Sequence, residues 1–224
     1  MVSRRMKDLA EIFSDGGYFV SGIDTDAGKT YATAWLTRRL LDAGKSVVTQ
    51  KFIQTGNTGM SEDIEAHRRL SGVGELDVDR EGLTAPIILT YPASAQLAAK
   101  VDNVEIDLTV IDRAREELGR RFDIVLTEGA GGLMVPITDT FFAVDYAVTR
   151  ELPIILVTNS RLGSINHTVL SLEAIKARGL KLAAVLYNTY FDRDPVIAPD
   201  TRAFIERYVA GEFPETAILD VPSM

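Results

Sequence analysis

Residues Gly22 to Thr30, GIDTDAGKT, combine two glycines with a lysine and a threonine in the order of a phosphate-binding loop. In such a loop, backbone N–H groups and the first turn of the following helix face phosphate oxygens. Lys29 would place its ammonium between the terminal phosphates of a nucleotide, and Thr30 would offer its hydroxyl to Mg²⁺. One residue more than in the common form of the loop separates Gly22 from Gly28. The sequence therefore indicates a variant phosphate-binding loop, with a plain glycine turn as the alternative.

Two further charged residues follow apolar stretches elsewhere in the chain. In Asp123–Gly132, DIVLTEGAGG, Glu128 comes directly after an apolar run. Because ligands bind at the carboxyl ends of parallel strands, Glu128 would reach the Mg²⁺ held by Thr30. Lys51 ends another apolar stretch and would project from the same edge, unless it is an ordinary surface lysine. Asp63, in the polar segment SEDIEA, is a weaker candidate, because acidic residues in polar loops are usually solvated.

The elements that would position these residues alternate along the chain. Apolar runs of strand length occur at Tyr18–Ser21, Ser46–Lys51, Asp123–Thr127, Pro153–Thr158 and Leu182–Tyr187. Stretches with helical spacing occur at Thr30–Asp42, Glu62–Leu70, Thr109–Arg120 and Asn166–Arg178. This alternation predicts an α/β fold, with a mostly parallel central sheet flanked by helices on both faces.

One domain accounts for most of the 224 residues. We expect residues 1–16 to be a short helical N-terminal extension and residues 17–224 to be a single domain, because no linker or internal repeat interrupts them. The polar segment Gly56–Val101 is long for a connection between strands, and such segments are more often functional than idle.

Composition excludes several classes of function. The chain has no cysteine, which removes disulfides, thiolate metal sites and cysteine nucleophiles. His67 and His167 are the only histidines, so oxygen-ligated Mg²⁺ is the natural metal. The net charge of −8 argues against nucleic-acid partners and anionic membrane surfaces. No stretch approaches the ~18 apolar residues of a membrane span, and we expect a cytoplasmic protein.

Four motifs, taken in order, resemble those of the dethiobiotin synthetase family. The loop GIDTDAGKT has that family's spacing, and EGAGG at Glu128–Gly132 matches its acidic motif. Lys51–Gly56, KFIQTG, resembles the family's lysine motif, with Phe52 in place of a proline. Leu162–His167, LGSINH, resembles a fourth motif of the same family. Together the motifs cover Tyr18 to about Asn188 and imply the P-loop NTPase fold.

The resemblance implies an ATP- and Mg²⁺-dependent ring closure. One amine of 7,8-diaminopelargonic acid (7,8-diaminononanoate) takes up CO₂ as a carbamate, and ATP phosphorylates the carbamate oxygen. The second amine then attacks the carbonyl and expels phosphate, which leaves dethiobiotin and ADP. The family resemblance also implies a homodimer with the active site at the interface.

The resemblance also assigns residues to roles. Lys29 and Lys51 would be catalytic, and Thr30, Asp63 and Glu128 would hold the metal. Nucleotide contacts are expected from Asp26, Ala27, Gly28, Lys29, Thr30, Tyr31, Asp63, Glu128, Gly129, Ala130, Gly131, Asn188 and Pro222. Substrate contacts are expected from Thr55, Gly163, Ser164, Ile165 and Asn166. The last element, Leu219–Pro222, lacks a glycine that the family commonly has near the base, so we expect weak discrimination among nucleoside triphosphates.

Three alternatives stand beside this interpretation. Partitioning-type P-loop ATPases carry a second lysine early in the loop, and Ile23–Ala27 contains none. Corrinoid amidases attach a glutaminase domain with a cysteine nucleophile, and this chain has no cysteine. A non-catalytic nucleotide-binding module would not need Lys51 and Glu128.

Overall fold

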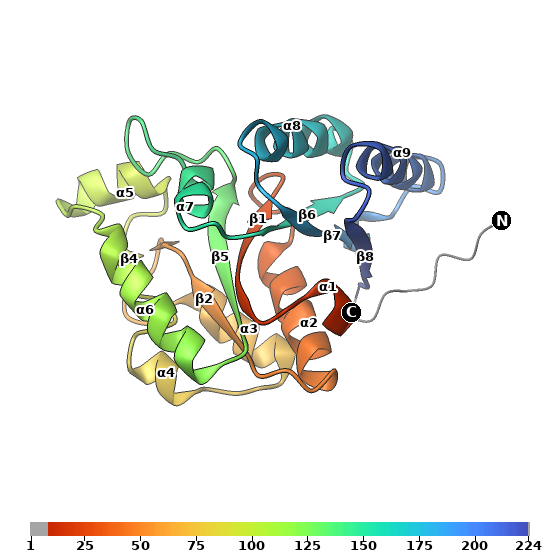
Figure 1. Cartoon of the computed structure of the whole chain (residues 1–224). Helices are drawn as coiled ribbons and strands as arrows, with labels where there is room; N and C mark the ends of the chain where they lie inside the picture. Colours follow the sequence, from red (N-terminus) through yellow and green to blue (C-terminus); the bar gives the residue numbers. More distant parts are fainter. Residues whose placement is uncertain (1–8, 224) are drawn as a thin grey trace.

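The computed structural model describes residues 9–223, and six of their strands form one parallel sheet (Figure 1). In sheet order these are β2 (Val47–Lys51), β5 (Ile124–Gly132), β1 (Gly16–Gly22), β6 (Ile154–Asn159), β7 (Leu182–Asn188) and β8 (Ala217–Val221). Every neighbouring pair is parallel. The predicted α/β fold with a mostly parallel sheet is confirmed, and β8 adds a strand that the sequence pattern did not indicate.

Helices cover both faces of the sheet (Figure 1). One face packs against α2 (Lys29–Asp42), with α1 (Leu9–Ile12) and α3 (Glu62–Ser71) beside α2. The other face carries α5 (Ala95–Asp102), α6 (Leu108–Arg121), α7 (Ala143–Thr149), α8 (Ser164–Ala177) and α9 (Ile197–Glu212). The expected helices are present with ends shifted by one or two residues, whereas α5, α7 and α9 were not predicted.

Strand side chains alternate between two hydrophobic clusters. Phe19 packs in the cluster under α6 to α9, while Tyr18 and Val20 pack in the cluster under α2. Leu156 and Val157 divide between the two clusters in the same way. Because both faces are covered, the strands read as continuous apolar runs and bury nearly every side chain.

The polar segment after β2 is folded rather than a long open loop. It contains α3, α4 (Asp77–Arg80) and a small parallel pair of strands, β3 (Gln54–Thr55) and β4 (Ile88–Leu89). Helix α3 starts at a side-chain cap, in which the Ser61 hydroxyl accepts a hydrogen bond from the Ile64 N–H at 3.2 Å. It ends at Gly72, which has a positive φ of 73°.

The N-terminal segment is packed against the sheet where it is described. Phe13 is fully buried, and Lys45 forms an ion pair with Asp15 at 2.7 Å. Gly16 already pairs with Ile124 inside β1, so this strand starts within the predicted extension. Of that extension, residues 1–8 lie outside the described residues.

Strand β5 runs past the point where the apolar pattern ends. The sequence predicted an apolar strand over Asp123–Thr127 that runs into Glu128, and in the structure the strand continues to Gly132. Gly129 lies against Phe19 in this extension, and a Cβ added to it would lie 3.0 Å from the ring, so the position has room only for glycine. It ends with Gly132 paired to Gly22, so the glycine-rich end of β5 lies beside the start of the phosphate-binding loop.

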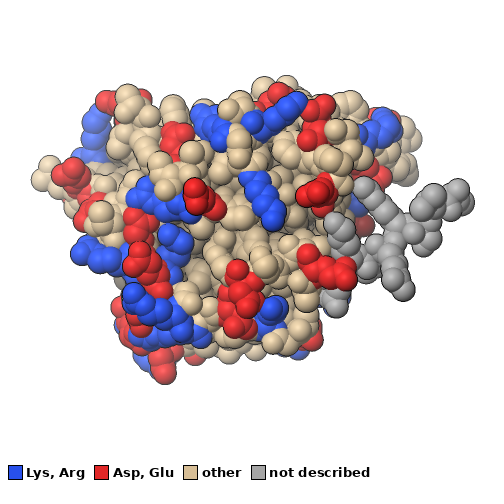
Figure 2. All heavy atoms as spheres, viewed as in Figure 1, with Lys and Arg blue, Asp and Glu red and all other residues tan. Residues whose placement is uncertain are grey.

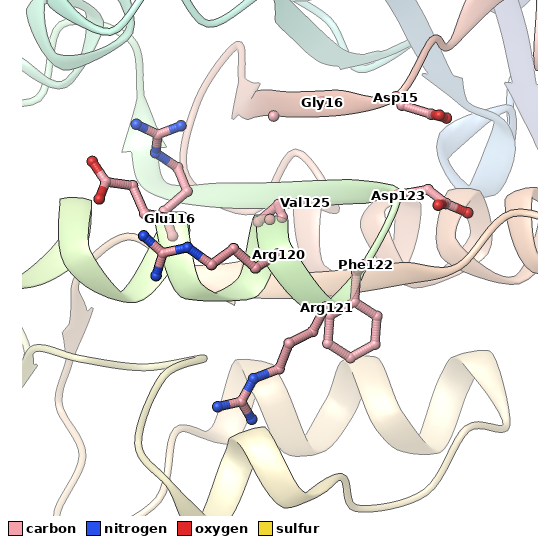
Figure 3. A pocket seen from close by; sticks show the side chains of 11 residues that line it. Asp15, Gly16, Glu116, Arg120, Arg121, Phe122, Asp123 and Val125 are labelled. Carbon is pink, nitrogen blue, oxygen red and sulfur yellow. The ribbon is translucent and has the colours of Figure 1, made fainter.

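A hollow of 640 Å³ lies at the opposite edge, where β1 and β5 begin and α6 ends (Figure 3). Two of its three arginines form ion pairs: Arg120 with Glu117 at 2.8 Å, and Arg121 with Glu81 at 2.9 Å. On the face seen in Figure 2, acidic and basic side chains are interspersed rather than gathered by sign. Within residues 9–223, no helix is long and apolar enough to cross a membrane.

Candidate active site

The loop between β1 and α2 has the backbone shape that a bound phosphate needs. Gly28 caps α2 with a φ of 88°, and an added Cβ would lie 2.1 Å from the Asn188 side-chain nitrogen. No side chain caps the start of α2, which leaves its first N–H groups available to an anion. The Lys29 ammonium donates to the Asp24 carbonyl at 3.2 Å, so it lies over the loop. Asp26 is exposed and Ala27 is buried.

Lys51 and Glu128 are direct neighbours on adjacent parallel strands, β2 and β5. Their side chains therefore project from the same face of the sheet. The Lys51 ammonium lies 3.0 Å from Glu128 Oε1, forms an ion pair with Asp63, and donates to the Gly129 carbonyl at 3.3 Å. Glu128 is fully buried and Lys51 is 4% exposed, so this pair is largely removed from water.

The three predicted metal ligands converge. The Thr30 hydroxyl lies 2.8 Å from Asp63 Oδ1 and 3.3 Å from Glu128 Oε1, within hydrogen-bonding distance of both carboxylates. Asp63 comes from α3 and Thr30 from α2, two helices that pack closely against each other. The weakest candidate of the sequence analysis, Asp63, is therefore part of the same cluster as Glu128.

His67 belongs to this cluster and was not predicted. Its Nε2 lies 2.8 Å from Glu128 Oε2, and the imidazole is fully buried. His67 lies four residues after Asp63 on α3, so both side chains share one helix face. That spacing was visible in the sequence and was the signal that could have identified His67.

The cluster shifts the protonation of its members. Burial alone would lower the pKa of Lys51, but the charges of Glu128 and Asp63 raise it above its usual value. Burial would raise the pKa of Glu128, but the Lys51 charge, the contact with the His67 imidazole and the Lys29 charge hold it well below its usual range. For Lys29, burial dominates and lowers the pKa, with Lys51 acting in the same direction and Glu128 against it. The pair Lys51–Glu128 is therefore charged at neutral pH.

Phe52 fixes the chain directly after Lys51. Its backbone N–H donates to the Glu128 carbonyl at 2.8 Å, and its ring is buried against Phe19 and Tyr146. The centroid of the Phe52 ring lies 4.6 Å from that of Tyr146. Aromatic packing thus provides the local rigidity that the proline of the family motif would have given.

Asn188, Tyr31 and Pro222, which were predicted to contact the nucleotide, lie close to the phosphate-binding loop. Asn188 ends β7 and donates from Nδ2 to the Ala27 carbonyl at 3.3 Å. The Tyr31 hydroxyl donates to the Pro222 carbonyl at 2.9 Å. Val221, which precedes Pro222, pairs with Asn188 across β8 and β7. This arrangement brings the last strand to the phosphate-binding loop.

The start of α8 lies on the same edge of the molecule. His167 Nδ1 is 3.4 Å from Asp24 Oδ2 in the loop. The helix begins at Ser164 with Gly163 as its cap, so its predicted start at Asn166 was late. The Ser164 hydroxyl donates to Asn159 Oδ1 at 2.6 Å rather than capping the helix. Ile165 is half-buried and Asn166 is exposed.

The structure does not bring Thr55 to the charged cluster by a hydrogen bond. Thr55 is half-buried in β3, and its hydroxyl has no hydrogen-bond partner within the described part of the chain. Gly131 and Ala130 lie further along β5, on the side of the phosphate-binding loop.

The oxygen donors fit Mg²⁺ held together with phosphate. Two carboxylates and one hydroxyl converge, and Mg²⁺ commonly takes one or two carboxylates, waters and substrate phosphate oxygens. Among residues 9–223, no group of three or more acidic or histidine side chains forms a self-sufficient metal cage. Thr30, Asp63 and Glu128 would therefore hold the ion, which would neutralise charge on the terminal phosphates.

Comparison with known proteins gives relatives over nearly the whole chain. The family model described as an AAA domain matches residues 16–223. The ATP-dependent dethiobiotin synthetase BioD 2 of Pasteurella multocida is 43% identical, over 89% of this chain and 93% of the relative. The protein of the same name from Haemophilus ducreyi is 46% identical, over 90% of this chain and 95% of the relative. The dethiobiotin synthetase BioD of Chlorobaculum tepidum is 46% identical, over 87% and 83%.

Among solved structures, a ParA family ATPase from Chlorobium tepidum has a similar fold. It superposes with a TM-score of 0.52 at 16% identity, covering 92% of this chain and 85% of that one. At this identity the likeness concerns the fold alone.

Proposed function

Because the chain belongs to the dethiobiotin synthetase family of ATP-dependent ligases, we propose that it closes 7,8-diaminopelargonic acid and CO₂ to dethiobiotin. ATP is converted to ADP and phosphate in the same cycle. The observation that carries the proposal is the convergence of Lys51, Asp63, Glu128 and Thr30 beside the phosphate-binding loop.

The reaction requires two anions to meet. One amine of the substrate takes up CO₂ as a carbamate, and a carbamate oxygen attacks the γ-phosphorus of ATP while the bond to the ADP oxygen breaks. The second amine then attacks the carbonyl carbon, the bond to the phosphorylated oxygen breaks, and phosphate leaves. Cations fixed in a largely buried site lower the barrier to the first step most effectively.

The chain supplies two such cations. Lys29 projects from the first residue of α2, where it would lie along the terminal phosphates. Lys51 is held by two carboxylates and a carbonyl, so its ammonium has a fixed position before any ligand arrives. In the proposed mechanism Lys51 stabilises the carbamate and the transferring phosphoryl group, without forming a covalent bond.

One assay tests the proposed function. Purified protein would be mixed with ATP, MgCl₂, bicarbonate and the diamine, and dethiobiotin would be sought by mass spectrometry. We expect dethiobiotin together with phosphate release that depends on the diamine. Phosphate release at the same rate without the diamine, and no dethiobiotin, would favour the partitioning-type ATPase instead.

The hydrogen bonds of Asn188 predict weak discrimination among nucleoside triphosphates. Both ends of its side-chain amide are used inside the protein, because Nδ2 donates to Ala27 and Oδ1 accepts from the Tyr190 N–H at 3.1 Å. An adenine ring would have to compete with these bonds. We expect kcat/KM values within about tenfold of one another for ATP, GTP and CTP, a span of ~1.4 kcal/mol. A preference for ATP of several hundredfold would refute this prediction.

The exposed side of α8 supports a homodimer with the start of that helix in its interface. Leu162 is 91% exposed and Leu170 is 61% exposed. Gly163, Asn166 and Leu170 follow one another at helical spacing along an exposed stripe. In the proposed dimer this stripe places residues Gly163 to Asn166 of one subunit at the substrate carboxylate of the other.

Leu170→Glu should therefore disrupt the dimer, because it would bury the new carboxylates of the two subunits against each other in the interface. We expect analytical ultracentrifugation to show a monomer, with turnover reduced by about tenfold or more. Leu97→Glu, which alters an exposed leucine on α5, is the matched control and should leave both mass and turnover unchanged. A Leu170→Glu protein that remains dimeric and active would exclude this interface.

A further inference from the structure

His67 makes a contact that the proposed reaction does not by itself require. Its Nε2 lies 2.8 Å from Glu128 Oε2, whereas Thr30 and Lys51 both contact the other oxygen, Oε1. The two oxygens of Glu128 thus have separate partners. The contact with His67 fixes the rotation of the carboxylate about its terminal bond, which otherwise varies broadly.

The helix that carries His67 is itself held at a second point. Arg68, the next residue on α3, makes two hydrogen bonds to Asp79, each 2.8 Å long, and donates to the Thr49 hydroxyl at 2.9 Å. Thr49 lies two residues before Lys51 on β2, so α3 is bound to the strand of Lys51 and to the strand of Glu128. His67 therefore reaches Glu128 from a rigid support.

The surroundings of the imidazole select one tautomer. Nδ1 of His67 is buried and has no hydrogen-bond partner within residues 9–223. A proton on Nδ1 would be a buried donor without an acceptor, which costs more than an unfilled acceptor lone pair. The proton consequently lies on Nε2, and His67 donates it to Glu128 Oε2.

We propose that His67 is a positioning residue, whose Nε2–H holds one oxygen of Glu128 so that the other faces Thr30, Lys51 and the terminal phosphates. The alternative is a buried histidine that only fills space in the core under α3. The inference rests on the proposed function, in which Glu128 is a magnesium ligand. Histidine and carboxylate partners that orient a metal ligand commonly contribute about 10- to 100-fold to metal affinity.

Two amide substitutions that differ only in length test this role. The side-chain nitrogen in His67→Gln can take the place of Nε2, whereas that in His67→Asn is too short to reach Glu128. Both place a neutral amide in the same pocket, so their costs in folding are comparable. Ser71→Ala removes a buried hydroxyl one turn along α3 that bonds only backbone carbonyls, and it serves as the control for packing.

Calorimetric titration of Mg²⁺ into protein saturated with the non-hydrolysable analogue of ATP measures the effect without turnover. We expect His67→Asn to weaken Mg²⁺ binding by about 10- to 100-fold, and His67→Gln and Ser71→Ala to stay within about threefold of the parent protein. In steady-state assays, His67→Asn should lower kcat and leave KM for the diamine unchanged. Equal Mg²⁺ affinities for the Asn and Gln variants, or an equal loss in Ser71→Ala, would overturn the proposal.

The binding titration contains no diamine, so its outcome is independent of dethiobiotin formation. If the parent protein made no dethiobiotin, the proposed reaction would be wrong while the Asn and Gln titrations would still decide the role of His67.

Discussion

Lys51→Ala is expected to lower the rate of dethiobiotin formation by about 100- to 1,000-fold, the loss typical of removing one preorganised group that stabilises transition-state charge. The ammonium is fixed by Glu128, Asp63 and the Gly129 carbonyl, so no water or neighbouring cation can take its place without reorganisation. Steady-state kinetics with mass-spectrometric detection would measure the effect on kcat.

The same substitution leaves Glu128 buried without its nearest cation. Removing one partner of a buried pair costs roughly 3–5 kcal/mol of folding stability, so the melting temperature should fall while circular dichroism at 25 °C still reports a folded protein. Lys45→Ala, which removes a lysine that pairs with Asp15 near the surface, should change neither property measurably. Near-normal turnover in a folded Lys51→Ala protein would remove Lys51 from the mechanism.

Glu128→Gln is expected to have the second large effect, because it keeps the shape of the side chain and removes its charge. Thr30 and Lys51 donate to Glu128 Oε1 and His67 donates to Oε2, so the amide NH₂ of Gln would face a donor in either orientation. We expect the ratio of ATP affinities with and without Mg²⁺ to fall by about tenfold or more. Turnover should fall by about 100-fold. Calorimetry with and without Mg²⁺ and steady-state kinetics would measure the two effects.

The pH dependence of stability provides an independent check on this carboxylate. The native pKa of Glu128 is held below its unfolded value of about 4.3, so its charge stabilises the fold above that pH. That contribution is lost as the pH falls through the native pKa. The stability difference between the parent protein and Glu128→Gln should therefore be full near pH 7 and should shrink in acid. Glu116→Gln, which alters an exposed carboxylate of the same helix α6, is the control. A difference that grows on acidification would contradict a charged Glu128.

Local patterns predicted the central elements of the fold. Apolar periodicity and the positions of glycines can be read within a short segment of sequence. They were sufficient to predict strands β1, β2, β6 and β7 and helices α2 and α8. Strand β8 was missed because AILDV is half-exposed at the sheet edge and lacks a continuous apolar run. Helix α7, AVDYAVT, is too short for its periodicity to separate it from a strand.

The site residues likewise fall into those that local sequence predicts and those that depend on tertiary packing. Lys51 and Glu128 lie in predicted parallel strands or directly after them, and Lys29 follows a glycine turn, so topology alone placed all three at one edge of the sheet. The positions of Asp63 and His67 depend on how α3 packs against α2 and β2, which is set by long-range contacts such as the hydrogen bond from Arg68 to Thr49. No sequence window contains those contacts. The occupied amide of Asn188 is likewise a property of the folded loop around Gly28.

The central claim is that ATP phosphorylates a carbamate oxygen beside Lys51. Bicarbonate labelled with heavy oxygen would be supplied in ordinary water, with ATP, Mg²⁺ and the diamine, and the mass of the released phosphate would be measured before the label exchanges with solvent. The account predicts one heavy oxygen in the phosphate for each dethiobiotin formed. Dethiobiotin accompanied by phosphate that carries only ordinary oxygen would contradict it.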